Sequence, residues 1–219
     1  PFSAGSHLDV RLANGLVRQY SLCNDPAHAL HYEIGVALAA QSRGGSRAMF
    51  DLAEGDQLEI SEPRNHFPVH EAAAHSLLLA GGIGVTPMLS MAHRLQALDR
   101  SFELHYFTRS EQEAAFANRL RAAPSASSAH FHPGLDAQAV RARLEALIRA
   151  LPMDAHVYAC GPAAFMECAL AAARSRGIGQ SQIHYEFFSN THAASDEAPR
   201  SPFELKLARS GRSIRVLPS

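Results

Sequence analysis

The sequence predicts two consecutive domains, an antiparallel β-domain followed by a doubly wound α/β domain. The first stretch, residues 1–70, alternates apolar and polar side chains with the two-residue period of half-buried strands. After it, short apolar runs recur about every 27 residues, which is the length of a strand plus a crossover helix. The stretches between these runs carry apolar residues at helical spacing. Alternating strands and helices of this kind are typical of a parallel sheet covered by helices.

The first domain is expected over residues 1–70. Its candidate strands are bounded by turn residues, such as those at 13–15, 24–26 and 54–56. Several short antiparallel strands in this length favour a barrel or a sandwich. The candidate strands span residues 7–12, 16–22, 30–38 and 57–61.

The second domain is expected over residues 71–188. Five strand-and-helix units in series predict a five-stranded, doubly wound parallel sheet. The expected strands span residues 75–80, 102–108, 129–132, 155–160 and 183–187. Three sets of residues each share one helical face: Met88, Met91, Leu95 and Leu98; Val140, Leu144, Leu147 and Leu151; and Phe165, Ala169, Leu170 and Ala173. Beyond them, residues 189–202 read as a linker, and alternation resumes at 203–207.

Composition limits the function classes. Of 219 residues, 47% are hydrophobic and 19% are charged, and the formal net charge is −1. These values favour a globular protein and give no sign of a nucleic-acid or membrane-surface partner. No apolar run approaches the roughly 20 residues of a spanning helix. The three cysteines are too far apart for a disulfide framework, so we expect a cytoplasmic protein.

Histidines are numerous, at 13, but their spacing does not indicate a metal site. The pairs His28/His31 and His130/His132 have no third ligand nearby in the sequence. We therefore expect no metal to be bound by these residues and interpret most histidines as solvated surface groups.

A glycine-rich turn follows the first strand of the α/β domain. The run GGIGVTP at 81–87 places Gly81, Gly82 and Gly84 between a strand and a helix. Its N–H groups and the helix dipole could hold a diphosphate or a carboxamide. Thr86 can cap that helix, and Pro87 suits its first turn. The spacing is not that of the GxGxxG fingerprint, so the turn alone leaves nucleotide binding and simple corner geometry equally open.

Two other strand ends carry candidate ligand contacts. The run YACGP at 158–162 puts Cys160 at the carboxyl edge of the fourth strand, with Gly161 and Pro162 opening the next helix. Ligands bind at this edge in open α/β sheets, although a buried cysteine can equally serve as a small hydrophobe. At the end of the second strand, Thr108 and Arg109 could meet a diphosphate or a 2′-phosphate.

Two motifs in the first domain could bind a flavin. In RQYSL at 18–22, Arg18 and Ser21 could contact a phosphate or a ring carbonyl, and Tyr20 could flank an isoalloxazine. The run RGGS at 43–46 has the composition of a phosphate-binding nest. Taken singly, the first motif is better explained as a strand with a surface arginine, and the second as a flexible loop.

Taken in order, seven motifs resemble the ferredoxin-reductase superfamily, and most closely the phthalate dioxygenase reductase family, which includes vanillate O-demethylase reductases. The resemblance covers nearly the whole chain. The motifs are RQYSL at 18–22, RGGS at 43–46, EGDQLEIS at 54–61, PRNHF at 63–67, GGIGVTPMLSM at 81–91, YACGP at 158–162 and HYEFF at 184–188.

The resemblance implies an FMN-binding antiparallel β-barrel, an NADH-binding α/β domain and a plant-type 2Fe-2S ferredoxin domain. Against this pattern the barrel is N-terminally incomplete, and the ferredoxin domain has only its beginning, 203–219. A plant-type cluster needs four cysteine ligands, which this stretch lacks. We therefore expect a piece of a longer reductase, with the 2Fe-2S cluster in the full-length protein only.

The resemblance also assigns residues. The flavin contacts would be Arg18, Tyr20 and Ser21, with Gly45 and Ser46 at the phosphate and Phe188 over the ring. The NADH contacts would be Gly81, Gly82, Gly84, Thr86, Thr108, Arg109, Gly161 and Pro162. Cys160, Glu186 and Thr86 would lie where nicotinamide meets flavin.

The implied function is that of an NADH-dependent flavin reductase component of a Rieske-type aromatic-ring oxygenase or O-demethylase, expected to be a monomer. Electrons would pass from NADH through FMN, which can release them singly, to a 2Fe-2S centre. One alternative is a flavin-free dehydrogenase, which would leave the first domain without a role. Another is a non-catalytic fragment or regulatory domain that keeps the reductase fold. A bound flavin, seen as a yellow colour, would distinguish the flavin reductase from both alternatives.

Overall fold

The computed structural model describes residues 1–28, 30–39, 42–122 and 126–188, and the two strands at 203–206 and 213–216. The chain groups into two compact units, Pro1–Phe188 and Ser189–Ser219. The expected domain boundary near residue 70 falls inside the first unit and stays a prediction.

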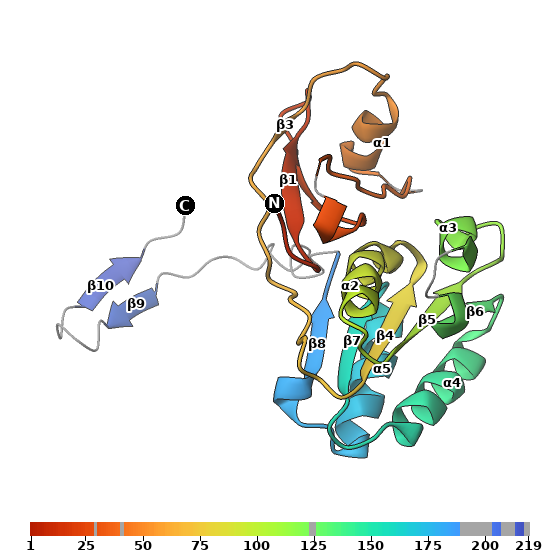
Figure 1. The fold of residues 1–219 in the computed structure, drawn as a ribbon. Helices are drawn as coiled ribbons and strands as arrows, with labels where there is room; N and C mark the ends of the chain where they lie inside the picture. Colours follow the sequence, from red (N-terminus) through yellow and green to blue (C-terminus); the bar gives the residue numbers. More distant parts are fainter. Residues whose placement is uncertain (29, 40–41, 123–125, 189–202, 207–212, 217–219) are drawn as a thin grey trace. The chain divides into compact units, whose positions relative to one another are not determined.

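The N-terminal part of the first unit contains a three-stranded antiparallel sheet, in the order β2-β1-β3 (Figure 1). The strands are β1 (His7–Arg11), β2 (Val17–Ser21) and β3 (Glu59–Ile60). The sheet buries Leu8 and Val10 together with Leu12 and Leu22, which flank the strands. This sheet confirms the antiparallel β-part that the alternating pattern predicts.

The prediction of a strand at 30–38 is wrong. The described part of this segment is irregular, with a single bridge between Leu22 and Ile34. The Asn24 side chain accepts from the backbone N–H of Glu33 (3.1 Å) and donates to the carbonyl of His31 (3.0 Å). These side-chain bonds take up backbone groups that a ladder would need, so the alternation of residue types produces no strand here.

A five-stranded parallel sheet follows, as the sequence predicts. Its order is β6-β5-β4-β7-β8, so the strand order reverses between β4 and β7. The strands are β4 (Ser76–Gly81), β5 (Phe102–Thr108), β6 (Ala129–Pro133), β7 (His156–Cys160) and β8 (Ile183–Glu186). The helices are α1 (Gly45–Phe50), α2 (Val85–Ala97), α3 (Ala117–Ala122), α4 (Ala137–Ala150) and α5 (Ala163–Arg176), and the short 3-10 turns are η1 (Pro26–His28), η2 (Gly82–Gly84), η3 (Ala126–Ser128) and η4 (Gln180–Gln182).

Helices cover both faces of this sheet (Figure 1). One core cluster joins Leu78 of β4 to the α2 face, and the other joins Leu79 to α4 and α5. All six residues of β4 are buried, which explains the unbroken apolar run at its position. The predicted helical faces are largely the packed ones, except that Leu98 lies just beyond α2 and is only partly buried.

The second unit contains one antiparallel pair, β9 (Phe203–Lys206) with β10 (Ser213–Val216). The first of these is the strand that alternation from residue 203 predicts. The linker expected at 189–202 lies outside the described residues. Among the residues that the structure describes, none of the helices has the length and apolar character needed to cross a membrane.

Candidate functional site

Most of the predicted nucleotide contacts lie at the carboxyl ends of β4 and β7, the two strands between which the sheet order reverses. Gly81 ends β4 and Cys160 ends β7, and Ala80 pairs with Cys160 in the ladder. A crevice forms at such a reversal because the connections leave the two strands in opposite directions. The topology places the predicted contacts at the reversal of the strand order, and ligand binding at this edge stays a prediction.

The glycine turn packs directly against the end of β7. A Cβ atom built on Gly84 would lie 2.2 Å from the carbonyl oxygen of Cys160, so only glycine allows this approach. Gly82 has φ +53°, and no heavy atom lies within 4 Å of the position of its missing Cβ. The backbone of Gly82 therefore remains open to a ligand.

Thr86 does not cap α2, contrary to the prediction. The N-cap residue is Gly84, and the Thr86 hydroxyl donates to the carbonyl of Ile83 at 3.0 Å. Because Val85 already begins the helix, Thr86 lies two residues beyond the capping position and cannot accept from the first N–H groups as an N-cap does. Pro87 lies in the first turn, as predicted.

Cys160 is fully buried beneath the turn. It pairs with Glu186 of β8, so the two side chains point to the same face of the sheet. Burial, and then the carboxylate of Glu186, raise the pKa of the Cys160 thiol well above its usual value. A neutral, buried thiol is not a nucleophile, which fits the expectation that Cys160 would contribute through packing and polarity.

Ser21 and Glu186 join the two parts of the first unit. The Ser21 hydroxyl donates to Oε2 of Glu186 at 3.3 Å, across 165 positions of sequence. Burial raises the pKa of the Glu186 carboxyl, and the hydrogen bond from Ser21 partly opposes this shift. The structure therefore brings Ser21, Glu186 and Cys160, which the sequence places on three separate strands, to one location.

His7 completes this group and was missed by the sequence analysis. Its Nδ1 lies 3.8 Å from Oε1 of Glu186 and has no hydrogen-bond partner among the described residues, although the side chain is 95% buried. Burial, then the charges of His66 and Arg64, lower the pKa of His7, which favours a neutral ring. The β1–β2 register pairs His7 with Ser21. This pairing is what places His7 at the site, and no motif in the neighbouring sequence predicts that position.

The predicted flavin residues divide between the two faces of β2. Arg18 and Tyr20 pair with Val10 and Leu8 and so share their face, whereas Ser21 lies on the opposite face beside His7. Arg18 lies against the start of α1, since a Cβ built on Gly45 would be 2.6 Å from its Nε. Arg18 and the RGGS segment, predicted separately as phosphate contacts, are therefore neighbours.

The RGGS segment is not an open loop. Helix α1 begins at Gly45, and its N-cap residue Gly44 has φ +91°. The hydroxyl of Ser46 accepts from the backbone N–H of Ala39 at 3.2 Å and donates to Ser42 Oγ at 3.0 Å. The segment is thus ordered by its own hydrogen bonds.

The remaining predicted contacts surround the same edge. Pro162 is the N-cap residue of α5 and Gly161 directly precedes it, next to the end of β7. Thr108 ends β5, where its hydroxyl donates to the Ser110 carbonyl at 2.8 Å, and Arg109 beside it is exposed. Phe188 follows β8 and is 43% exposed.

An ion pair that the sequence did not suggest fixes the irregular segment after β2. Arg119 of α3 donates from Nη1 to both carboxylate oxygens of Glu33, each at 2.7 Å. Because the two residues are 86 positions apart, no local pattern links them. The pair holds the loop around Glu33 beside the α/β part, close to the site.

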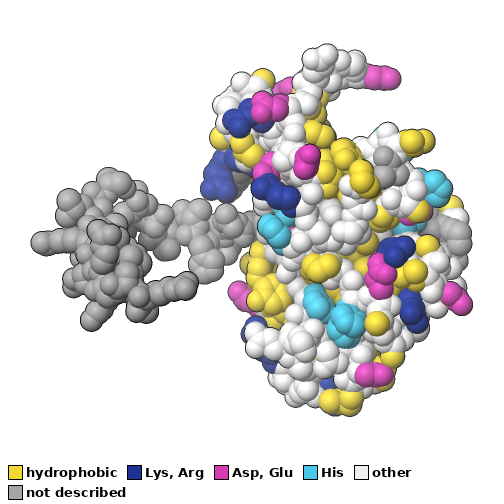
Figure 2. Space-filling view, turned by 60° about the vertical axis from the view of Figure 1, so that its left-hand side comes forward, with side chains coloured by type: hydrophobic (Ala, Val, Ile, Leu, Met, Phe, Trp, Pro, Cys, Tyr) yellow, Lys and Arg dark blue, Asp and Glu magenta, His cyan; other side chains and the backbone are white. Residues whose placement is uncertain are grey.

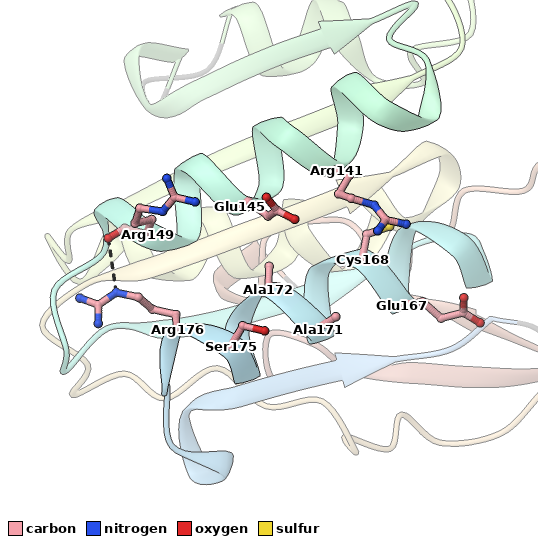
Figure 3. Close-up of a pocket in the computed structure, with 9 residues that line it drawn as sticks. All are labelled: Arg141, Glu145, Arg149, Glu167, Cys168, Ala171, Ala172, Ser175 and Arg176. Carbon is pink, nitrogen blue, oxygen red and sulfur yellow. Dashed lines mark hydrogen bonds between the residues drawn. The ribbon is translucent and has the colours of Figure 1, made fainter.

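A surface hollow in another part of the first unit does not include this site. It has a volume of about 670 Å³ and lies between α4 and α5 (Figure 3). Figure 3 shows side chains of both helices bordering it, and none of the site residues named above is among them. Its lining residues are Arg141, Glu145, Arg149, Glu167, Cys168, Ala171, Ala172, Ser175 and Arg176.

Comparison with known proteins decides the family. Vanillate O-demethylase oxidoreductase of Pseudomonas sp. (strain HR199 / DSM 7063) is 42% identical over 219 residues, covering 99% of this chain and 68% of that protein. Phthalate dioxygenase reductase of Burkholderia cepacia is 38% identical over 218 residues, covering 99% of this chain and 66% of that protein. This chain belongs to the vanillate O-demethylase oxidoreductase and phthalate dioxygenase reductase family.

The reductase family is also supported by the structure and by a family model. A solved phthalate dioxygenase reductase, described as modular and as transferring electrons from pyridine nucleotides to a 2Fe-2S centre, matches with a TM-score of 0.81 and 37% identity, covering 99% of this chain and 67% of that one. Residues 61–183 match the model described as dimethylamine monooxygenase subunit DmmA-like, N-terminal domain. The chain is therefore an electron-transfer oxidoreductase with the two-domain fold of reductases that use a flavin and a pyridine nucleotide.

Proposed function

We propose that this reductase accepts a hydride from NADH onto bound FMN and passes the electrons singly to a 2Fe-2S centre that serves a Rieske-type oxygenase. The observation that carries the proposal is the convergence of Ser21, Glu186 and Cys160 at the reversal of the parallel sheet. This convergence joins the antiparallel part, where the family binds its flavin, to the edge where a nicotinamide would dock.

The residues present fit a nicotinamide beside a flavin. The open backbone at Gly82 offers N–H groups without a side chain in the way. Nδ1 of His7 is buried without a partner among the described residues, which indicates a position for a further polar group. Phe188, at 43% exposed, is an aromatic side chain available to cover a ring.

The protein would supply orientation and polarity, while the flavin would convert the two-electron donor to single-electron transfer. Oε2 of Glu186 is held by Ser21, which leaves Oε1 directed toward His7 and free to accept from the nicotinamide carboxamide. Cys160 would fix the positions of Glu186, its partner in the β7–β8 ladder, and of the glycine turn, which packs against its backbone. Arg18 and the start of α1 would hold the flavin phosphate.

The flavin is expected to be FMN. The RGGS segment is compact, and no aromatic platform for an adenine is recognisable beside it in the sequence. The purified chain, after incubation with excess flavin and desalting, should be yellow and should release mainly FMN on heating, as measured by chromatography. Mainly FAD in the released fraction would overturn the assignment. A chain that retains no flavin at all would instead favour the non-catalytic alternative.

NADH is expected to be the better donor. Arg109, at the end of β5, is exposed and is a lone cation, whereas recognition of a 2′-phosphate needs a positively charged group fixed beside the ribose. Steady-state kcat/KM with an artificial acceptor such as ferricyanide should therefore be higher for NADH than for NADPH. Arg109→Ala should change the ratio of the two values little. A higher kcat/KM with NADPH would contradict this prediction.

We further propose that the partner is a Rieske-type aromatic-ring oxygenase or O-demethylase, that the reductase is a cytoplasmic monomer, and that the 2Fe-2S centre belongs to the full-length reductase. The support is the family, in which relatives are named for vanillate and phthalate. Without the cluster the chain should reduce ferricyanide but should not support product formation by such an oxygenase. Turnover equal to that of the full-length reductase would show that the flavin reaches the partner directly.

A further inference from the structure

We propose that Glu103, His105 and His130 form a binding site for a divalent transition-metal ion of the Zn²⁺ type, on the strands β5 and β6. Each of the three residues offers one ligand atom, and these atoms all lie within 4.8 Å of one another. The nearest pair is Nε2 of His105 and Oε2 of Glu103, at 3.2 Å. Zinc bonds of about 2.0–2.2 Å in tetrahedral geometry place ligand atoms roughly 3.3 Å apart, so this pair is already at ligand spacing.

The two strands hold the ligands rigidly. Glu103 and His105 are two residues apart on β5 and therefore point to the same face of the sheet. His130 pairs with His105 in the β5–β6 ladder, and their rings are stacked with centroids 4.6 Å apart. Ligands fixed on adjacent strands lose little conformational entropy when an ion binds.

A neighbouring histidine orients His105. Nδ1 of His105 lies 2.9 Å from Nε2 of His132. When His105 carries its proton on Nδ1, it donates to His132, and the lone pair of Nε2 faces Glu103. Metal-binding histidines commonly use their second ring nitrogen in this way, which fixes the tautomer that binds the ion. His132 is thus a positioning residue and not a ligand.

The electrostatics suit a cation with nitrogen and oxygen ligands. His105 is 2% exposed, so an ion bound to it would be largely shielded from solvent on that side. Arg143 of α4 is the opposing charge; it is exposed and therefore screened by solvent and salt. The Glu103 side chain is 46% exposed, which leaves an entry path and room for water as a further ligand.

This site is distinct from the reductase site. Glu103 lies near the amino-terminal end of β5 and His105 at its middle, whereas the proposed reductase site lies at the carboxyl ends of β4 and β7. An ion here would bind β6, the edge strand of the sheet, to β5. No metal site is expected from the sequence because no third ligand lies near His130 along the chain; the other two ligands of the proposed site come from the adjacent strand.

The test is a titration of the purified, chelator-treated chain with ZnCl₂, followed by isothermal calorimetry and by thermal unfolding. One ion should bind per chain. At a free zinc concentration about 100 times Kd, Tm should rise by about 5–10 °C, because the ion binds the folded state only.

The variants Glu103→Gln and His130→Asn should each raise Kd at least about tenfold, and His132→Phe should raise it about 10- to 100-fold by releasing His105. Both ligand variants avoid the buried His105, so they should fold. His28→Asn is the matched control, since His28 forms a histidine–carboxylate pair with Asp25 at 3.0 Å and belongs to no three-ligand cluster among the described residues. Cys168→Ala controls for binding by the partly exposed thiol.

Both control variants should bind zinc as the unmodified chain does. Absence of saturable binding at a 1:1 ratio would overturn the proposal. Saturable binding whose Kd is unchanged by Glu103→Gln and His130→Asn would also overturn it, because the ion would then bind elsewhere. None of these readouts depends on NADH or flavin, so the proposed reductase function is tested separately.

Discussion

Replacing Glu186 with glutamine should slow flavin reduction by NADH about 10- to 150-fold while making the protein more stable at neutral pH. The first effect would follow from the loss of the proposed charge-assisted hydrogen bond to the nicotinamide carboxamide, worth about 1.5–3 kcal/mol. The second follows from burial, which raises the pKa of the Glu186 carboxyl and so disfavours its ionised form in the folded protein. A residue that lowers the stability of the folded protein but increases the rate of the reaction is expected at an active site.

The two effects depend on pH in a defined direction. A carboxyl whose folded pKa is raised binds its proton more tightly in the folded state, so its stabilising contribution is complete below the unfolded pKa of about 4.5 and is lost as pH rises through the folded pKa. The stability gain of Glu186→Gln should therefore be present at pH 7 and vanish near pH 4.5. The difference in rate between the two proteins should also narrow toward low pH, because protonated Glu186 no longer accepts as a carboxylate.

Rapid mixing of the flavin-loaded protein with NADH measures the rate, and thermal unfolding from pH 4.5 to pH 8 measures stability. Glu167→Gln is the matched control, since Glu167 lies on α5 in the hollow of Figure 3 and outside the site. It should change neither the rate nor the pH dependence of Tm. A Glu186→Gln protein that reduces its flavin at the unmodified rate would remove Glu186 from the reaction.

Replacing Cys160 with alanine should slow the same step about 100-fold and leave flavin content nearly intact. Cys160 is 0% exposed, and its carbonyl oxygen lies against the glycine turn, so loss of Sγ should let Glu186 and the turn shift. A displacement of about 1 Å between reacting groups costs roughly a hundredfold in rate. The flavin should stay bound because its expected contacts are on β2 and α1, on other parts of the chain.

The control for Cys160→Ala is Cys168→Ala, which makes the same substitution at a partly exposed position on α5. Flavin absorbance at constant protein concentration gives the content, and rapid mixing gives the rate. We expect Cys160→Ala also to lower stability by about 1–3 kcal/mol, as loss of a buried group usually does. If the flavin of Cys160→Ala is reduced at the same rate as that of Cys168→Ala, Cys160 contributes to packing only.

The elements with a strong hydrophobic signal were predictable from the sequence. β4 is buried on both faces, so its residues form an unbroken apolar run. In α4, the buried residues Leu144 and Ile148 are four positions apart, which is the spacing of one helical face. The strand expected at 30–38 failed because alternation of residue types does not reveal that the Asn24 side chain bonds the backbone of that segment. Thr86 failed as a cap because the helix begins at Val85, two residues earlier than a cap at Thr86 requires.

The sequence by itself determined the order and type of most elements, the glycine turn and the position of Cys160 at a strand end, because these depend on neighbours within one or two turns of the chain. The tertiary structure decided which strands are adjacent, and this placed His7, Ser21 and Glu186 together from opposite ends of the first unit. It also placed Glu103 and His105 beside His130 through the β5–β6 ladder. Strand pairing is set by burial of whole sheet faces, which sums contributions from distant residues, and no local spacing encodes it.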